Sequence, residues 1–370
     1  MTPLPHPLPL RTDPARLGLR RLVVPTSAGE IVVHAGRETG GPALLLLHGA
    51  AGSWTTWTPV LSASDLSGAP LTDVVALDLP GWGASGGFER VGSVEDMTDA
   101  VAEVARALGY TSWRVVGHSL GGLIALDLAA RHPRETVAVT LVSPTGVGVL
   151  DAVRRPVRGG LALPWFAGML LAMRGLALLG GAGRALVRAL DRWGWMPTLS
   201  APLFAGAVHP SVIAALAGEL RPAAFAHAAR LAADYEPRTW TAIVCPVRAV
   251  RGARDVFTGE RDAGVFAALI RDFHEVRLRD AGHFANVERP DAVAAAIAAS
   301  GPARERHGAR GVGIQVGSLA AHRVGAATAP LAFELDLPPR IADAVHHPLA
   351  PLDDHDRAVG VDVEVVELER

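Results

Sequence analysis

The 370-residue chain has a single cysteine, Cys245, and no lysine, so all 35 of its basic residues are arginines. One cysteine excludes an internal disulfide bond, and the first 18 residues hold no sustained apolar run of the kind found in a signal peptide. We therefore expect a cytoplasmic protein. The net charge of −2 at pH 7 gives no basic field for a phosphate backbone, so we expect no nucleic-acid partner.

Strand-like and helix-like segments alternate over the first 145 residues. Residues 18–36 predict two antiparallel strands, and "PALLLLHG" at 42–49 is a short apolar run typical of a strand buried on both faces of a sheet. Further strands are predicted at 73–79, 112–117 and 136–142, and a helix at 93–108. This alternation predicts an α/β fold with a doubly wound, mostly parallel sheet.

The alternation breaks between Pro144 and Thr239, where the chain is rich in Ala, Leu and Gly at helical spacing. "AIVCPVRAV" at 242–250 then resumes the strand pattern. These features predict a helical cap at 146–240 that is inserted into the sheet domain. The remaining divisions are an N-terminal extension at 1–17, the α/β core at 18–145 and 241–300, and a C-terminal tail at 301–370.

The C-terminal tail shows neither the helical nor the strand period over any length. We expect this tail to be disordered on its composition. A small partner-binding appendage and a mistranslated end of the reading frame remain alternatives. The stretch "HHPLAPLDDHD" at 346–356 lies in this tail and is expected to be solvated, so we predict no metal site there and no cofactor.

Two stretches match the pattern G-x-S-x-G, one at Ser85 and one at Ser119. Ser85 is followed by residues typical of a loop. Ser119 lies between a predicted strand and a predicted helix, so it alone occupies the sharp turn that exposes a nucleophilic hydroxyl. Glycines 117 and 121 remove the Cβ atoms that would clash where the strand and the helix close. We predict that Ser119 is a nucleophile.

A serine nucleophile needs a base within hydrogen-bonding reach and a third group that orients the base. His283 and Asp255 each follow a predicted strand, and loops at the carboxyl ends of parallel strands converge in space. We therefore predict His283 as the base and Asp255 as the orienting acid. Asp262 and Asp280 are weaker candidates, because the first is expected inside a helix and the second is close to His283 in the chain.

The order of Ser119, Asp255 and His283, together with five sequence blocks, resembles the α/β-hydrolase family. The blocks are "LLLLHGAAGS" (44–53), "DLPGWGAS" (78–85), "VVGHSLGG" (115–122), "VRGARDVFTG" (250–259) and "DAGHFANVERP" (280–290). The resemblance covers residues 18 to 300. It implies an oxyanion hole formed by the backbone N–H groups of Ala50 and Leu120.

Several other residues near the predicted site are assigned by their position in these loops. Trp54, Trp82 and Phe284 are expected to contact the substrate, with core packing an equally weighted alternative for the two tryptophans. His48 and His118 are expected to have structural roles. Asp78 and the glycines at 81 and 83 are expected to shape a turn.

We therefore predict a hydrolase that cleaves a carboxylic ester, or a similarly activated carbonyl, of an apolar small molecule through an acyl-enzyme on Ser119. Thioester cleavage, carbon–carbon bond hydrolysis, perhydrolysis and a lyase step remain alternatives within the same triad. A non-catalytic small-molecule receptor is the alternative from another class. The oligomeric state stays open.

The cap contains "GGLALPWFAGMLLAM" at 159–173, a run without charge that is short for a membrane span. We expect it to form a lid whose apolar residues favour an apolar acyl or alkyl group. Membrane association is not expected. Docking of this apolar cap on a lipid surface is kept as a third alternative.

Overall fold

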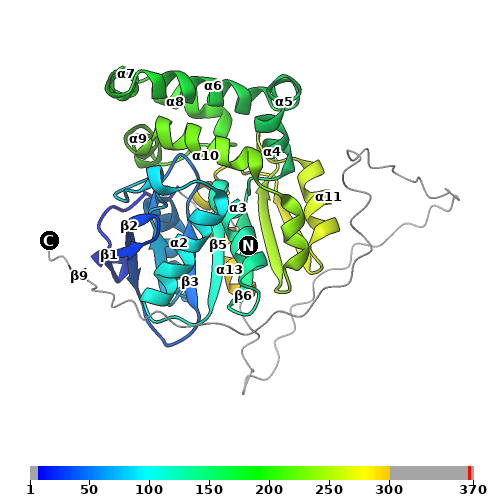
Figure 1. The fold of residues 1–370 in the computed structure, drawn as a ribbon. Coiled ribbons are helices and arrows are strands. Elements are labelled where there is room, and N and C mark those ends of the chain that lie inside the picture. Colours follow the sequence, from blue (N-terminus) through cyan, green and yellow to red (C-terminus); the bar gives the residue numbers. More distant parts are fainter. Residues whose placement is uncertain (1–6, 301–365, 368–370) are drawn as a thin grey trace, which may run out of the picture. The chain divides into compact units, whose positions relative to one another are not determined.

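The computed structural model of the chain describes residues 7–300 and 366–367 (Figure 1). Its strands are β1 (Leu19–Thr26), β2 (Gly29–Gly36), β3 (Ala43–Leu47), β4 (Val74–Leu77), β5 (Trp113–His118), β6 (Thr136–Val142), β7 (Val247–Gly252), β8 (Phe273–Leu278) and β9 (Val366–Glu367). The strands of the described residues form one sheet in the order β8-β7-β6-β5-β3-β4-β2-β1-β9.

Helices connect most of these strands. The core helices are α1 (Thr58–Leu66), α2 (Val94–Ala107), α3 (Leu120–Arg131), α11 (Glu260–Leu269), α12 (Ala285–Glu288) and α13 (Pro290–Ala299). Between β6 and β7 lie α4 (Val147–Arg154), α5 (Pro156–Ala162), α6 (Pro164–Leu178), α7 (Gly181–Arg192), α8 (Met196–Ser200), α9 (Pro210–Glu219) and α10 (Pro222–Asp234). Short 3-10 turns are η1 (Ala15–Leu17), η2 (Trp54–Trp57), η3 (Phe88–Arg90), η4 (Ala201–Leu203) and η5 (Pro237–Ala242).

Six strands of the sheet, β3 to β8, run parallel to their neighbours within this set. The pairs β1 with β2, β2 with β4, and β1 with β9 are antiparallel. Parallel neighbours need long crossovers, which the helices supply. The predicted α/β fold with a doubly wound, mostly parallel sheet is therefore confirmed.

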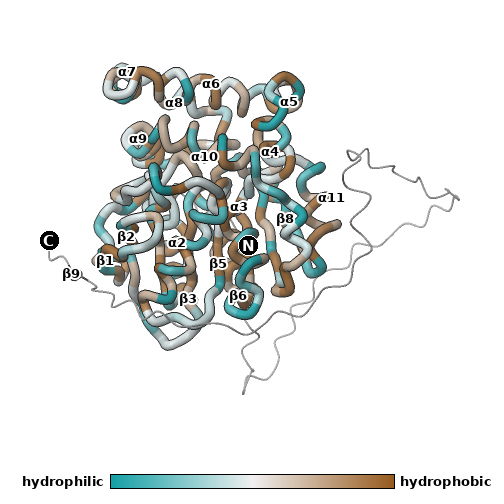
Figure 2. Tube along the Cα trace, in the orientation of Figure 1, coloured by the Kyte–Doolittle hydropathy of each residue, from teal (hydrophilic) through white to brown (hydrophobic). Residues whose placement is uncertain are grey.

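Helices cover both faces of the sheet, and strand β3 illustrates why its sequence is apolar throughout. Successive side chains of a strand point to opposite faces. Leu45 and Leu47 pack with residues of α2 and α3 in one buried cluster, whereas Leu44 and Leu46 pack with residues of α1 and α13 in another. The central strands are accordingly drawn largely in brown in Figure 2. A strand that is buried on both faces has no polar alternation.

The helices α4 to α10 form a helical insertion between β6 and β7. Helix α10 packs on α6 and on α4, and α5 packs on α4 and α6. Figure 1 places α10 and α4 next to the ends of the parallel strands, with α5, α6, α7 and α8 in an outer layer beyond them. No strand occurs in the insertion, and no helix among the described residues is long and apolar enough to cross a membrane.

The described part of the predicted N-terminal extension packs on the body of the protein. The Leu10 N–H donates a hydrogen bond to Ser211 Oγ at 2.9 Å, and the Arg11 N–H donates one to Thr58 Oγ1 at 2.9 Å. The prediction of a disordered tail at 301–370 lies outside the described residues, apart from Val366 and Glu367, which pair with β1. The stretch at 346–356 lies outside them as well.

Candidate active site

Ser119 occupies the turn between β5 and α3 in an unusual backbone conformation. Its φ of 50° and ψ of −116° fall in a region that residues with a Cβ atom rarely adopt. Such a conformation costs about 1–3 kcal/mol and persists only where neighbouring structure enforces it. Here the Ser119 N–H donates to the Val142 carbonyl at 3.1 Å, and the Ser119 carbonyl accepts from the Thr145 N–H at 2.9 Å. Both the N–H and the carbonyl of Ser119 are therefore held in place, one by β6 and the other by the loop that follows β6.

Two glycines allow the backbone to close around this turn. A Cβ atom on Gly117 would lie 2.1 Å from the carbonyl oxygen of Gly121, and one on Gly121 would lie 2.3 Å from the carbonyl oxygen of Leu47. Both contacts are with backbone, which has little room to move. The G-x-S-x-G pattern at Ser119 is thus a steric requirement of packing α3 against β5 and β3.

Ser85, the second match to the pattern, has its hydroxyl engaged by backbone. Ser85 Oγ donates to the Asp78 carbonyl at 2.7 Å and accepts from the Val32 N–H at 2.8 Å. The Asp78 carboxylate accepts from the N–H groups of Trp54 and Ala84. These bonds brace a turn, in line with the expectation for Asp78.

His283 and Asp255 are brought together although 28 positions separate them in the chain. His283 Nδ1 donates to Asp255 Oδ1 at 3.0 Å, and both side chains are buried. The same carboxylate oxygen accepts from the N–H groups of Phe257 and Thr258. Burial raises the pKa of Asp255, but the His283 ring and the Phe257 N–H outweigh burial and hold that pKa below its usual value. Asp255 is therefore a fixed negative charge against the imidazole.

The two weaker acid candidates make other contacts. Asp262 lies in α11 and accepts from the N–H groups of Gly148 and Gly259, at 2.8 Å and 2.9 Å. Asp280 pairs with Arg289 at 2.8 Å. Neither carboxylate is bonded to His283, so Asp255 is the acid that the geometry selects.

Ser119 and His283 line one cavity of about 750 Å³, a volume that includes its opening to solvent. The core contributes Ala50, Leu120, Phe257 and Phe284 to the lining, among others. The helical insertion contributes Val149, Val153, Phe166, Met169, Leu203, Phe225, Ala228, Ala229 and Ala232. The wall supplied by the insertion is entirely apolar. The residues of α10 follow the spacing i, i+3, i+4, i+7, a signal for one helix face that sequence reasoning passed over.

Trp54 and Trp82, which were predicted to contact substrate, do not line this cavity. Trp54 is buried and stacks on His34, with ring centroids 3.9 Å apart. Trp82 is buried, and its Nε1–H donates to the Ala50 carbonyl at 2.8 Å. The alternative of core packing therefore describes both, because each indole fills space behind the loops. Phe284, in contrast, lines the cavity.

The backbone N–H groups of Ala50 and Leu120 are free donors at the cavity wall. Neither makes a hydrogen bond to any residue that the structure describes. The Gly49 carbonyl accepts from His48 Nδ1 at 2.7 Å and from the Gly52 N–H at 3.1 Å. A trans peptide places the N–H of the next residue opposite the carbonyl, so these bonds fix the direction of the Ala50 N–H.

His48 and His118 are buried, neutral side chains that support this arrangement. Burial lowers the pKa of His48, whose Nε2 accepts from the Leu79 N–H at 3.0 Å. Burial and the neighbouring His283 ring lower the pKa of His118 to about 3. His118 Nε2 donates to the His283 carbonyl at 3.0 Å. The residue before Ser119 thus holds the backbone of His283.

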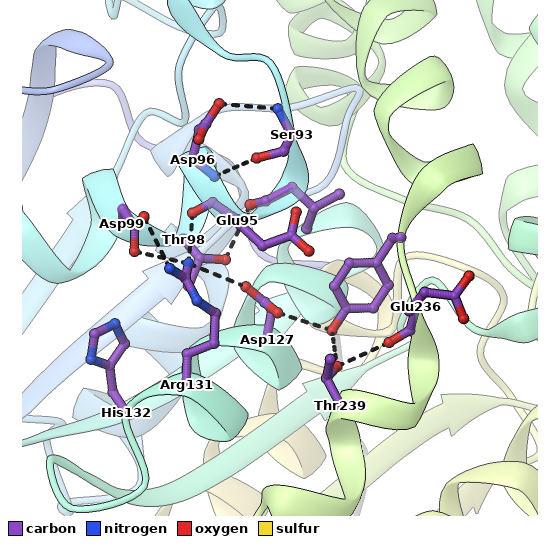
Figure 3. A network of polar contacts seen from close by, with 12 residues as sticks. Ser93, Glu95, Asp96, Thr98, Asp99, Asp127, Arg131, His132, Glu236 and Thr239 are labelled. Carbon is purple, nitrogen blue, oxygen red and sulfur yellow. Dashed lines mark hydrogen bonds and ion pairs between the residues drawn. The ribbon is translucent and has the colours of Figure 1, made fainter. Parts of the chain in front are cut away.

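A buried polar network joins α3 to the end of the helical insertion (Figure 3). Asp127 of α3 is fully buried and accepts from the Tyr235 hydroxyl at 3.1 Å, and burial raises the pKa of Asp127. The Tyr235 hydroxyl also accepts from Trp240 Nε1 at 2.9 Å. Arg131 Nη1 forms an ion pair with the other carboxylate oxygen of Asp127, Oδ2, at 3.8 Å. The network ties the chain leaving the insertion to the helix that begins at Ser119.

No group of three or more His, Cys, Asp or Glu side chains in the described part of the chain is arranged to hold a metal ion. The single cysteine, Cys245, is buried, and burial raises the pKa of its thiol to about 11. This thiol is therefore a poor nucleophile.

Comparisons with known proteins agree with this fold. A profile of the alpha/beta hydrolase family matches residues 44–296, which is more than half of the chain. The dihydrolipoyllysine-residue acetyltransferase component of the acetoin cleaving system of Cupriavidus necator is 38% identical over 125 residues, which are 33% of this chain and 31% of that protein. A 2-hydroxy-6-oxononadienedioate/2-hydroxy-6-oxononatrienedioate hydrolase of Burkholderia vietnamiensis is 32% identical over 122 residues, 33% of this chain and 42% of that one.

The chain spans less than half the length of these two curated relatives. Among solved structures, a thermophilic esterase from Thermogutta terrifontis superposes with a TM-score of 0.54 at 21% identity, and covers 76% of this chain and 97% of its own. That similarity concerns the fold. The chain belongs to the alpha/beta hydrolase family.

Proposed function

We propose that the protein is a serine hydrolase that cleaves a carboxylic ester, or a similarly activated carbonyl, through an acyl-enzyme on Ser119. One observation carries this proposal: a serine in a strained strand-to-helix turn shares a cavity with a histidine whose Nδ1 is bonded to a buried carboxylate. A nucleophile, a base and an orienting acid are the three parts that acyl transfer requires.

In the proposed reaction, His283 accepts the proton of the Ser119 hydroxyl as its oxygen attacks the carbonyl carbon. The negative charge that develops on the carbonyl oxygen is met by the N–H groups of Ala50 and Leu120, and by the positive end of α3. His283 then donates its proton to the leaving alcohol, which leaves an ester on Ser119. Water, deprotonated by His283, hydrolyses this ester and regenerates the serine. Asp255 stabilises the imidazolium in both halves.

The proposed substrate carries an apolar acyl or alkyl group. The apolar side chains of the helical insertion that line the cavity support this class, because they offer burial of hydrocarbon and no charged partner. In this proposal the insertion acts as a cap over the site. The name of one relative, the 2-hydroxy-6-oxononadienedioate/2-hydroxy-6-oxononatrienedioate hydrolase of Burkholderia vietnamiensis, supports a hydrolytic reaction.

The proposal is tested with an alkyl fluorophosphonate, which reacts with activated serines. The purified chain is expected to gain one phosphonyl group on Ser119, located by peptide mapping, and Ser119→Ala is expected to gain none. Ser85→Ala is the matched control and is expected to label as the parent does. A folded parent that does not label would contradict the proposal and favour a receptor. A panel of acyl esters, thioesters and vinylogous diketones then separates the reaction types.

A further inference from the structure

Exposed apolar side chains are concentrated on one part of the helical insertion. The described residues include 13 large apolar side chains that are exposed, and ten of these lie between residues 157 and 199. Leu178 is 89% exposed and Trp193 is 69% exposed. We call this set the docking face: Val157, Leu161, Trp165, Leu171, Leu178, Leu179, Leu186, Trp193, Trp195 and Leu199. Soluble surfaces rarely gather so many large apolar side chains without a partner.

Helix α6 illustrates the apolar character of this face most clearly. From Pro164 to Leu178 its only charged residue is Arg174. One side packs inward through Phe166, Leu170 and Met173. The other side exposes Trp165, Leu171 and Leu178. A helix that is apolar all round belongs in a core or against lipid, yet α6 lies in the outermost layer of the insertion (Figures 1 and 2).

The same elements carry a strong positive charge. Residues 154–199 contain seven arginines and one acidic residue, Asp191, a net charge of +6 in a chain whose total is −2. Six of the arginines are exposed: Arg155, Arg158, Arg174, Arg184, Arg188 and Arg192. Within the described ranges, none of these six forms an ion pair or a side-chain hydrogen bond. The charge is therefore available to an external anion.

We propose that the docking face binds the surface of an anionic phospholipid bilayer. Leucine and tryptophan side chains enter the boundary between headgroups and acyl chains, while arginine guanidinium groups pair with lipid phosphates. Tryptophan is the residue most suited to that boundary, since its indole combines an apolar ring with one N–H donor. Phe166 and Met169 of α6 line the cavity, so the docked helix is also a wall of the proposed active site.

Charge favours a lipid surface over a second copy of the chain. A two-fold dimer places the same patch of both copies together, so a dimer through this face would oppose arginine to arginine. An anionic bilayer complements the same arginines at every position. This inference departs from the expectation that the protein does not associate with membranes, because the sequence did not reveal which side of α6 is exposed.

The test uses the full-length chain with Ser119→Ala, so that hydrolysis cannot alter the lipid and the result does not rest on the proposed reaction. Vesicles of phosphatidylglycerol and phosphatidylcholine in equal amounts are expected to sediment this protein at low salt. Vesicles of phosphatidylcholine alone are expected to bind it more weakly. Brominated lipids are expected to quench part of the tryptophan fluorescence of this protein, and a smaller part in the double variant Trp193→Ser/Trp195→Ser. The double variant is expected to bind the anionic vesicles about tenfold more weakly.

Matched charge variants test whether binding depends on the arginines of the docking face or on positive charge anywhere on the surface. Arg184→Gln/Arg188→Gln is expected to weaken binding about 25-fold, at about fivefold per arginine near an anionic surface. Arg271→Gln/Arg279→Gln removes the same charge from exposed positions on the core and is expected to change binding little. Circular dichroism and thermal unfolding check that each variant is folded.

Three outcomes would overturn the proposal. The first is a parent that does not bind the anionic vesicles, and the second is an equal loss of binding in both arginine pairs. The third is a dimer in sedimentation velocity that Trp193→Ser/Trp195→Ser dissociates, because a second copy would then occupy the face. In the chain that retains Ser119, Trp193→Ser/Trp195→Ser is expected to leave the hydrolysis of a water-soluble short ester unchanged. Docking and catalysis are therefore measured separately.

Discussion

Replacing His118 with glutamine is expected to remove part of the acid sensitivity of the fold. His118 is 1% exposed and donates from Nε2 to the His283 carbonyl. Burial, together with the nearby His283 ring, lowers the pKa of His118 from the usual 6.5 to about 3. A glutamine amide can donate to the same carbonyl, and it has no proton to gain in this range.

The sign and size of the effect follow from the two pKa values. A pKa that is lower in the folded state means that the unfolded chain binds the proton first. The contribution of His118 to the free energy of unfolding is therefore fully present above pH 6.5 and is lost as the pH falls toward 3. At about pH 4.5 the unfolded residue is almost fully protonated and the folded one almost neutral, which costs about 2.5 kcal/mol relative to about pH 7.5.

Urea unfolding at these two pH values measures the difference. The parent is expected to lose about 2.5 kcal/mol more unfolding free energy between them than His118→Gln loses. His34 and His48, whose pKa values burial also lowers, are present in both proteins and cancel in the comparison. His274→Gln, at a side chain that is 72% exposed, is the control and should follow the parent. Equal losses of unfolding free energy in the parent and in His118→Gln would show that His118 does not cause this acid sensitivity.

Three further predictions follow from the site. Gly121→Ala places a Cβ 2.3 Å from the Leu47 carbonyl, so we expect lower thermal stability and loss of fluorophosphonate labelling; unchanged labelling would contradict the packing argument. Asp255→Asn removes a buried charge and should lower kcat by about 10²–10⁴, with KM little changed, in steady-state ester hydrolysis. Tyr235→Phe leaves Asp127 and Trp240 without this partner and should cost about 1–3 kcal/mol in urea unfolding, while a neutral result would discount the network.

Local patterns in the sequence were sufficient to predict the strands of the sheet and the position of Ser119 in a turn. The strand predicted at 136–142 is β6, and the two antiparallel strands predicted at 18–36 are β1 and β2. Each of these segments is a short run rich in β-branched and aliphatic residues. Such a run indicates a buried strand without information from distant parts of the chain. The turn at Ser119 follows from the same cause, because the glycines at 117 and 121 are required by contacts with adjacent backbone.

The side chains that surround the site could not be predicted, because their positions depend on tertiary contacts that a local sequence pattern does not contain. An indole in a loop is apolar wherever it packs, so the sequence could not assign Trp82 to the cavity or to the core behind the cavity. Its bond to the Ala50 carbonyl joins positions 32 residues apart. The exposed side of α6 could not be predicted either, because a sequence that is apolar all round does not reveal which side of the helix lacks a partner.

We propose that Ser119, His283 and Asp255 form one catalytic unit beside two free backbone N–H donors. A crystal structure of the phosphonylated protein tests it most directly. We expect a bond from phosphorus to Ser119 Oγ, with the phosphoryl oxygen within hydrogen-bonding distance of both the Ala50 and Leu120 N–H groups and His283 still paired with Asp255. A phosphonyl group on another residue, or a phosphoryl oxygen turned away from both amides, would contradict it.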